Sequence, residues 1–325
     1  MLNTPVLVLV ETDESQPTPA SAELLTTARR LTSGDVLALA LAPVSASASA
    51  LLAGHGATRL LVAELAERAC LAAPVADALV AAVQHTGPAA VLVTSDYRGK
   101  EAAGSAALLL GSACVSDVAE LEVDEDGLRA SKLVLSGSWS TTAALGTGGH
   151  PPVLAVRPGS VEVPAPLSAE PLAAEPLEVS LRPESAAVRL VSREVSHAAS
   201  GPDLASARTV VVMGRGTEGD LELVRSLAEP LGAAVGATRV ACDEGWIDRS
   251  AQVGQTGVSI SPSLYLSLGV SGAVHHTSGI QGAGTIVAID SDSEAPIFEI
   301  ADFGVVGDVT EVVPQLVSEL ARLRG

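Results

Sequence analysis

The chain has 325 residues with a formal net charge of −19 at pH 7, from 38 acidic and 19 basic side chains, and only 2% of its residues are aromatic. The phosphates of a nucleic acid would be repelled by so acidic a chain, and few aromatic side chains are present on which bases could stack. General nucleic-acid binding is therefore excluded. A membrane-spanning helix is also excluded, because no uncharged apolar run reaches about 18 residues. The length indicates about two domains.

The compartment can be inferred from the cysteines and the N-terminus. Cys70, Cys114 and Cys242 are far apart and form neither a C-x-x-C pair nor a zinc spacing. The first segment, MLNTPVLVLVE, has no basic region and no cleavage site, so it is interpreted as a strand rather than a signal peptide. We therefore expect a reducing, cytoplasmic setting and no membrane insertion.

The first half alternates short apolar runs with segments of helical spacing. Strands are predicted at residues 5–10, 35–40, 58–63 and 88–95, and helices at residues 21–31, 45–52, 74–84 and about 99–110. This alternation is typical of a parallel sheet with helices on its faces. After Cys114 the pattern changes to extended segments at residues 117–123, 128–135 and 141–144, before a closing strand at residues 152–157.

No nucleotide-binding fingerprint occurs in the first half. The first strand is not followed by G-x-G-x-x-G, and G-x-x-x-x-G-K-[ST] is absent from the chain. Thr94, Ser95 and Asp96 lie at the carboxyl end of a predicted strand, which is where doubly wound folds bind ligands. The alternative is that Ser95 or Asp96 only caps the next helix.

A Pro-rich segment at residues 157–183 predicts an extended connection over the surface, with room for edge strands. Residues 185–196 alternate like one more strand. We place the domain boundary near residue 197, which gives an N-terminal α/β domain at residues 1–196 and a C-terminal domain at residues 197–325.

The second half opens with a strand at residues 209–213 that leads into Gly214-Arg215-Gly216 and a helical stretch at residues 218–230. An arginine between glycines at a strand-to-helix turn suits an anion site, although tight turns also use glycine for geometry alone. A short strand then ends at Thr238-Arg239. The turn Gln252 to Gly257 combines amides, a hydroxyl and glycines, so it could wrap a polar, planar ligand or be a surface loop.

The remaining elements are predicted as a helix at residues 262–269, an extended segment at residues 270–276, and strands at residues 285–290 and 295–302. On an extended segment His275 and His276 would point opposite ways, so they are not a metal pair. Asp308 is expected to cap a helix, with Glu311 as its N3 acid. Pro314 either kinks that helix or marks its start.

Six of these segments in order, GRG, GATR, QVGQTG, LGVSGAVHH, TIVAID and EAPIFEIADFGVVGD, closely resemble the alpha subunit of the electron transfer flavoproteins. The specific match covers residues 209–314, and the first half resembles the family only in layout and in segments such as PVLVLVE and KEAAG. The resemblance implies two α/β domains, each built on a mostly parallel sheet flanked by helices. The C-terminal one is expected to be a flavodoxin/Rossmann-like FAD-binding domain.

The resemblance also implies partners. Such proteins are heterodimers with a beta subunit that commonly holds AMP. They take electrons from acyl-CoA or related dehydrogenases, as in fatty acid beta-oxidation, and pass them to a membrane quinone oxidoreductase. The chain would then be a redox electron carrier rather than an enzyme with its own substrate.

The resemblance assigns roles along the bound FAD. Arg215 would contact the phosphate region, and Arg239 would lie near the isoalloxazine ring and favour negative charge there, because it stays charged at any working pH. The Thr256 hydroxyl would lie close to N5. His276 would lie near the pyrimidine carbonyl, donating a hydrogen bond or carrying charge as its pKa decides. The full expected set is Arg215, Thr238, Arg239, Val253, Gly254, Gln255, Thr256, Ser271, Gly272, Ala273, Val274, His275, His276, Asp290, Asp308 and Val309, the last three towards the ADP end.

The sequence departs from the family at several of these places. Asp290 stands where Asn is usual, and a carboxylate near a diphosphate is repulsive unless it is paired. His275 stands where Gln is common. Acids at residues 218, 220 and 222 follow the GRG turn; they either weaken FAD binding or favour the N-terminus of the next helix, and we prefer the second.

These departures motivate a competing interpretation, a non-redox nucleotide-binding or regulatory subunit that kept the fold. Arg239, Thr256 and His276 argue against it. An NAD-dependent dehydrogenase is disfavoured, because residues 10–16 lack the glycine fingerprint.

Overall fold

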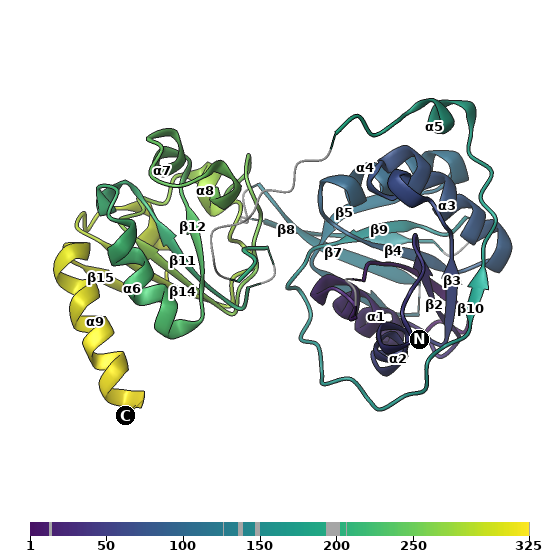
Figure 1. Ribbon diagram of the computed structural model, residues 1–325, viewed down its shortest axis with the longest axis horizontal. Coiled ribbons are helices and arrows are strands. Elements are labelled where there is room, and N and C mark those ends of the chain that lie inside the picture. Colours follow the sequence, from purple (N-terminus) through teal and green to yellow (C-terminus); the bar gives the residue numbers. More distant parts are fainter. Residues whose placement is uncertain are drawn as a thin grey trace. The chain divides into compact units, whose positions relative to one another are not determined.

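The computed structural model describes residues 1–12, 15–125, 127–135, 139–146, 150–192, 202–205 and 207–324. Two compact units make up the chain, Met1–Arg193 and Glu194–Gly325 (Figure 1). The boundary predicted near residue 197 lies outside the described residues. Both units are α/β with parallel main sheets, so the predicted fold class is confirmed.

The N-terminal unit is built on a seven-stranded parallel sheet in the order β10-β3-β2-β1-β4-β9-β5. Its strands are β1 Val6–Val10, β2 Val36–Ala40, β3 Arg59–Val62, β4 Ala90–Thr94, β5 Cys114–Val118, β9 Val153–Val156 and β10 Ala174–Pro176. The helices are α1 Pro19–Leu31, α2 Ala46–Gly54, the 3-10 turn η1 Ala66–Cys70, α3 Ala72–Thr86 and α4 Tyr97–Leu110.

Helices cover both faces of this sheet, with α1 and α2 on one side and α3 and α4 on the other (Figure 1). Alternate residues of each strand face opposite sides: Val6 and Val8 pack with α1, whereas Leu7 and Leu9 pack with α3 and α4. Because both faces are buried, the strands are continuously apolar, which is why they could be found from the sequence. A small antiparallel sheet of β6 Glu120–Val123, β7 Leu128–Val134 and β8 Trp139–Leu145 is inserted before β9.

The Pro-rich segment after β9 is extended and attached to the N-terminal unit along its length. β10 pairs with β3 at the sheet edge, and Glu175 of β10 accepts hydrogen bonds from Arg59 Nε and Nη2 at 2.9 and 2.6 Å. Further along, Arg182 Nε donates to Asp77 Oδ1 at 2.5 Å. The expected edge strand is therefore present.

The strand predicted at residues 185–196 is wrong in its described part. Residues Pro183–Ala187 form the short helix α5, and residues 188–192 join no sheet. Pro183 occupies the first turn, where its fixed φ favours helix, and the buried Ser185 hydroxyl accepts from Arg182 Nη2 at 3.3 Å. Residues 188–192 pair with no strand, so their alternating apolar residues do not form a β-strand. Residues 193–196 lie outside the described residues.

The start of the Pro-rich segment gives a testable pH effect. Glu23 of α1 accepts from Gly159 N at 2.7 Å, and burial raises the pKa of this carboxyl to about 7. Between about pH 4.5 and pH 7 the folded unit keeps a proton on Glu23 that the unfolded chain has released. The free energy of unfolding therefore falls as the pH rises through this range. We expect Glu23→Gln to stabilise the N-terminal unit at pH 8 by about 1 kcal/mol, with no gain at pH 4. Urea unfolding of the variant and wild type at both pH values measures this, and an equal change at both would contradict it.

The C-terminal unit is built on a five-stranded parallel sheet in the order β12-β11-β13-β14-β15. Its strands are β11 Thr209–Met213, β12 Ala234–Ala237, β13 Leu264–Leu268, β14 Thr285–Asp290 and β15 Phe303–Val306. The helices are α6 Leu221–Leu231, α7 Arg239–Asp243, α8 Val274–Thr277 and α9 Val309–Arg324, with 3-10 turns η2 Arg215–Thr217, η3 Arg249–Ala251 and η4 Pro296–Glu299. α6, α9 and α7 pack in one core cluster on one face of the sheet, and the later part of the β12–β13 connection and the segments after β13 and β14 cover the other face.

Three predictions in this unit are wrong. Residues 264–268 form the central strand β13 rather than a helix; Leu266 and Leu268 face one core cluster and Tyr265 the other, so burial on both sides overrode the local helix signal. Residues 274–277 form the helical turn α8, so His275 and His276 do not alternate along a strand. The strand predicted at residues 295–302 begins only at Phe303, because Pro296 starts the turn η4.

The final helix agrees with its predicted start. Asp308 Oδ1 accepts from Thr310 N at 2.8 Å, and Pro314 lies inside α9 rather than at its beginning. Among the described residues, no helix is long and apolar enough to cross a membrane.

Candidate functional site

Most of the expected binding residues follow the carboxyl ends of strands in the C-terminal unit. β11 leads to Arg215, β12 to Thr238 and Arg239, and β13 to residues 271–276. β12 and β13 lie on opposite sides of β11 (Figure 1), and the segment after β11 leads to α6 on one face of the sheet, whereas the segment after β13 covers the other face. Open α/β sheets bind ligands at such a topological switch point.

Three glycines bring the loops after β11 and β13 into direct backbone contact. Gly214 N donates to Leu268 O at 2.8 Å, and Gly216 N donates to Gly269 O at 3.0 Å. A Cβ on Gly214 would lie 2.1 Å from Gly269 O, and one on Gly269 would lie 2.5 Å from Gly216 Cα. The glycines at this turn are thus required by close approach, and they place Arg215 at the edge with its side chain exposed.

The loop of residues 252–257 packs against the turn that carries the two histidines. Gln255 N donates to His275 O at 2.7 Å, and Val253 N donates to Ala237 O at 2.9 Å. A Cβ on Gly254, whose φ is +140°, would lie 2.6 Å from His275 O. These contacts tie the loop to both β12 and α8.

Thr256 is oriented by a residue that the sequence analysis did not assign. The buried Gln252 donates from Nε2 to Thr256 Oγ1 at 3.0 Å. Because the threonine oxygen accepts this bond, its own O–H remains available to donate, and no described residue accepts it. Thr256 is exposed, so the hydroxyl can act as a donor towards a ligand.

His276 is buried, and both of its ring nitrogens have partners inside the unit. Nδ1 lies 3.0 Å from Val253 O and Nε2 lies 2.7 Å from the Tyr265 hydroxyl. A carbonyl can only accept, so Nδ1 carries the proton and Nε2 accepts from Tyr265. Burial lowers the pKa of His276 to about 4. The ring is therefore neutral and both of its nitrogens are already hydrogen-bonded, while the position of His276 near the pyrimidine carbonyl stays a prediction.

Backbone donors gather where the loop after β13 turns into α8. Among the described contacts, none of the N–H groups of residues 271–275 donates a hydrogen bond. Ser271, Ala273, Val274 and His275 are exposed, whereas Gly272 is buried. A run of unused N–H groups beside a hydroxyl is suited to a ligand rich in oxygen and nitrogen acceptors.

The two arginines of the edge are exposed. Arg239 has a side chain 68% exposed, and its Nε lies 3.8 Å from Asp243 Oδ2, while Asp243 is held more closely by Arg249 at 2.5 Å. Arg215 forms no ion pair among the described residues. The Thr238 hydroxyl accepts from Ala241 N at 3.4 Å and so caps α7. Both guanidinium groups can therefore turn to a ligand without breaking a strong bond.

The acids of this edge already serve as turn and helix caps. Asp290 Oδ1 accepts from Asp292 N at 3.0 Å, and Asp308 Oδ1 accepts from both Thr310 N and Thr310 Oγ1. Asp220 caps α6 through Leu223 N at 2.9 Å, in agreement with the preferred interpretation of the acidic stretch. The Val309 side chain is buried in the core, so only its backbone could meet a ligand.

Two residues of the site network were missed from the sequence, Gln252 and Tyr265. Gln252 lies inside the QVGQTG motif, and only its burial reveals that it positions Thr256. Tyr265 lies in the segment that was predicted as a helix. A fully buried tyrosine needs a partner for its hydroxyl, but the sequence does not indicate which.

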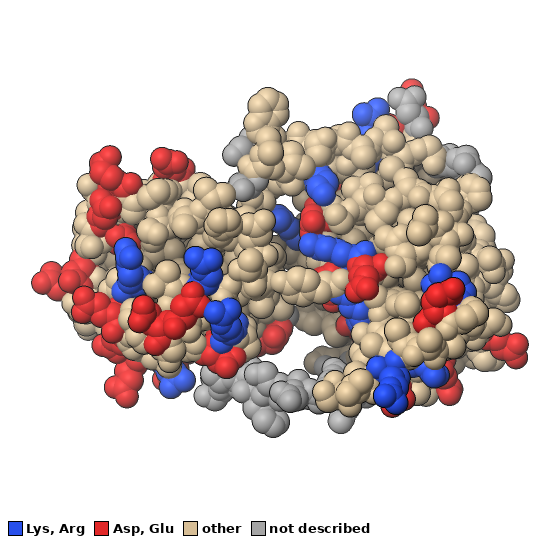
Figure 2. Space-filling view, turned by 90° about the horizontal axis from the view of Figure 1, so that it is seen from above, with Lys and Arg blue, Asp and Glu red and all other residues tan. Residues whose placement is uncertain are grey.

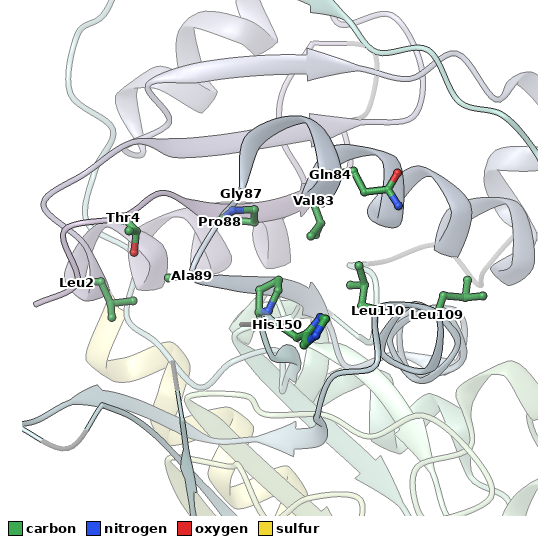
Figure 3. Close-up of a pocket in the computed structure, with 11 residues that line it drawn as sticks. Leu2, Thr4, Val83, Gln84, Gly87, Pro88, Ala89, Leu109, Leu110 and His150 are labelled. Atoms are coloured by element: carbon green, nitrogen blue, oxygen red, sulfur yellow. The ribbon is translucent and has the colours of Figure 1, made fainter. Parts of the chain in front are cut away.

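The N-terminal unit contains a groove of about 690 Å³, shown in Figure 3, at the amino ends of β1, β4 and β9. Leu2, Val83, Leu109 and Leu110 line it with other, mostly apolar residues, and His150 lies within it. It is at the opposite edge from Thr94, Ser95 and Asp96. Asp96 caps α4 by accepting from Gly99 N at 2.6 Å, and this cap is the one that the sequence predicts.

Comparisons with known proteins identify the family. The model described as "Electron transfer flavoprotein domain" matches residues 6–182, and the model described as "Electron transfer flavoprotein FAD-binding domain" matches residues 203–281. The chain is 39% identical over 327 residues to an electron transfer flavoprotein subunit alpha of Mycobacterium leprae, covering 98% of this chain and 99% of that protein.

Two further relatives carry the same description. The subunit alpha of Bacillus subtilis is 31% identical over 324 residues, covering 98% of each chain. The mitochondrial subunit alpha of Arabidopsis thaliana is 36% identical over 236 residues, covering 71% of this chain and 64% of that protein. The chain therefore belongs to the electron transfer flavoprotein alpha subunit family, and its C-terminal unit contains that family's FAD-binding domain.

Proposed function

We propose that the chain binds FAD at the carboxyl edge of its C-terminal sheet and, in a heterodimer with a beta subunit, carries electrons from acyl-CoA or related dehydrogenases to a membrane quinone oxidoreductase. The observation that carries the proposal is the gathering of unused donors at this edge. These are the N–H groups of residues 271–275, the Thr256 hydroxyl and the exposed Arg215 and Arg239.

The residues at this edge fit such a cofactor. FAD offers acceptors along its whole length, and bound FAD can take up and release electrons singly or in pairs. The guanidinium of Arg215 is suited to bind the phosphates of FAD. The N–H groups of residues 271–275 are suited to bind its ribityl chain and the edge of its ring. Asp290 and Asp308 are already used by backbone and hydroxyl donors, which reduces their repulsion towards a diphosphate.

The neutral His276 supports the cofactor loop from behind. It links Val253 of the loop to Tyr265 of the central strand, so the loop cannot shift without breaking a buried hydrogen bond. Gln252 then fixes the Thr256 hydroxyl as a donor. Together these side chains pre-organise the edge before any ligand arrives.

The proposed partners follow from the family. The beta subunit is proposed to hold AMP, and the complex to work in the cytoplasm in fatty acid beta-oxidation. The free state of Cys70, Cys114 and Cys242 is compatible with a reducing compartment.

The first test is a visible spectrum of the chain purified with its beta subunit, followed by stepwise dithionite reduction. Flavin absorption bands that bleach reversibly are the expected result. A colourless complex that cannot be loaded with FAD would contradict the proposal and favour the non-redox nucleotide-binding alternative, which the acids at residues 218, 220 and 222 motivate.

Arg239→Gln tests the charge at the ring. Removing a permanent positive charge disfavours the negative charge that reduction adds, so we expect the midpoint potential of bound FAD to fall by about 30 mV or more, equal to about a tenfold loss of preference for the reduced form. Spectroelectrochemistry of the loaded heterodimer measures it. Arg225→Gln, which removes an exposed arginine from α6, is the matched control, and an equal shift in both variants would refute the assignment.

A further inference from the structure

A group of basic side chains lies at the carboxyl edge of the N-terminal sheet, in the other unit from the proposed FAD site. Lys100 stands in the first turn of α4, Arg157 directly follows β9, and Lys132 lies on β7. Lys100 and Lys132 are the only lysines in the chain. We call Lys100, Lys132 and Arg157 the basic cluster.

Asp117 is the carboxylate at the centre of this cluster. Its Oδ1 lies 2.7 Å from Lys100 Nζ and accepts from Ser95 Oγ at 3.0 Å. Asp117 has φ +57°, a left-handed conformation that costs a non-glycine residue about 1 kcal/mol or more, and the pairing of β5 with β9 shifts register there. The irregularity turns Asp117 towards Lys100 and Ser95, and these partners hold the pKa of its carboxyl below its usual range against the effect of burial.

In the part of the chain that the structure describes, the side chains of Arg157 and Lys132 are the unpaired members of the cluster. Neither side chain forms an ion pair or a hydrogen bond among the described residues. Arg157 is half-buried, and burial lowers the pKa of its guanidinium although Asp117 acts in the opposite direction. The guanidinium of Arg157 has lost part of its hydration, and no ion pair with a described residue offsets the free energy that this desolvation costs.

The charges near Asp117 do not balance. Asp117 interacts electrostatically with all three basic side chains, and among the described residues it is the carboxylate that acts on Arg157. Within this group of four side chains, three positive charges stand against one negative charge, an excess of about two in a chain whose net charge is −19. In Figure 2 basic and acidic side chains lie side by side at several places on the N-terminal unit.

We propose that the basic cluster binds the phosphate group of a small molecule at the carboxyl edge of the N-terminal sheet. A phosphate monoester carries about −1.5 to −2 charges at pH 7, which matches the excess, and its oxygens fit the fork of an arginine. Arg157 and Lys132 are the primary ligands, and Lys100 contributes while Asp117 and Ser95 hold it in place. The carboxyl edge of a parallel sheet is where such folds bind ligands.

The two lysines give a readout that belongs to this site alone. The full chain, labelled with ¹³C at lysine and saturated with FAD so that Arg215 is occupied, is titrated with inorganic phosphate and with a nucleoside monophosphate. We expect the lysine side-chain signals to shift saturably with a Kd of about 1 mM or tighter. If the nucleoside monophosphate binds more tightly than inorganic phosphate, the natural ligand is a larger molecule that carries a phosphate group. If the two bind equally, the natural ligand is free phosphate.

Variants decide whether the cluster is responsible. Arg157→Gln should weaken phosphate binding about tenfold, because it removes one of the two unpaired cations. Arg129→Gln is the matched control: it removes an arginine from the same strand as Lys132, one that pairs with Asp124. Should Arg157→Gln fail to fold, Lys132→Gln replaces it, with the lysine signal of residue 100 as readout.

Several results would overturn the proposal. One is the absence of a lysine shift up to about 50 mM phosphate, far above the expected Kd. Another is an equal shift with sodium chloride at the same ionic strength, which would show unspecific screening. Equal affinities of the Arg157→Gln and Arg129→Gln variants would likewise exclude the cluster as the binding site.

Discussion

Gly269→Ala is expected to abolish FAD loading and to destabilise the C-terminal unit by about 3 kcal/mol. Gly269 has φ +63°, and a Cβ there would lie 2.5 Å from Gly216 Cα and 2.9 Å from Gly216 N. Since those atoms belong to the backbone, no side-chain rotation relieves the contact. The loops after β11 and β13 would have to separate, and Arg215 would move away from the edge.

Gly232→Ala is the control that separates this steric effect from the free-energy cost of placing alanine at a positive φ. Gly232 caps α6 with φ +60°, nearly the same backbone, but nothing lies within 4 Å of an added Cβ. We expect this variant to lose about 1 kcal/mol and to keep FAD. Urea unfolding and flavin content of the purified heterodimers measure both. Equal losses in the two variants would mean that the loop contact does not matter.

Acidification is expected to destabilise the C-terminal unit through His276, in the range between about pH 6.5 and pH 4. The pKa of His276 falls from 6.5 in the unfolded chain to about 4 in the fold, because burial disfavours the charged ring. The unfolded state therefore binds the proton first, so the stability present above pH 6.5 is lost as the pH falls. The difference amounts to about 3 kcal/mol.

Tryptophan fluorescence can follow this unit separately. Trp139 belongs to the N-terminal unit and Trp246 to the C-terminal unit, so a Trp139→Phe background reports Trp246 alone. In that background His276→Asn should flatten the pH dependence, although its stability at pH 7 will also fall because Tyr265 loses its acceptor. His275→Asn, at the exposed neighbour, should keep the wild-type slope. An unchanged slope in His276→Asn would disprove the assignment.

The parts of the fold that were predictable are those whose signal is local. The strands of the N-terminal sheet are buried on both faces, and the C-terminal strands at residues 209–213 and 285–290 are short apolar runs ended by turn residues. The caps by Asp96 and Asp308 follow from side chains that bond two or three residues ahead. The segments around β13 and η4 failed, because periodicity in a short run does not distinguish a buried strand from a helix.

For the site, the order of the motifs was enough to indicate the family and to single out the residues of the carboxyl edge. The bonds that organise those residues were not accessible from the sequence. Gln252 donates to Thr256 within one loop, but Tyr265, His276 and Val253 come from three separate segments. The charge of His276 could not be decided either, since its pKa depends on burial among these neighbours.

The sequence by itself determined the α/β class, the positions of most strands and helices, the family and the set of edge residues. Periodicity, turn chemistry and motif order are all written in neighbouring residues. Only the tertiary structure decided that His276 is neutral and turned inward, that Gly214, Gly216 and Gly269 meet backbone to backbone, and that Lys100, Lys132 and Arg157 all interact electrostatically with Asp117. The reason is physical: desolvation, close approach and charge excess depend on distances between atoms that are remote along the chain.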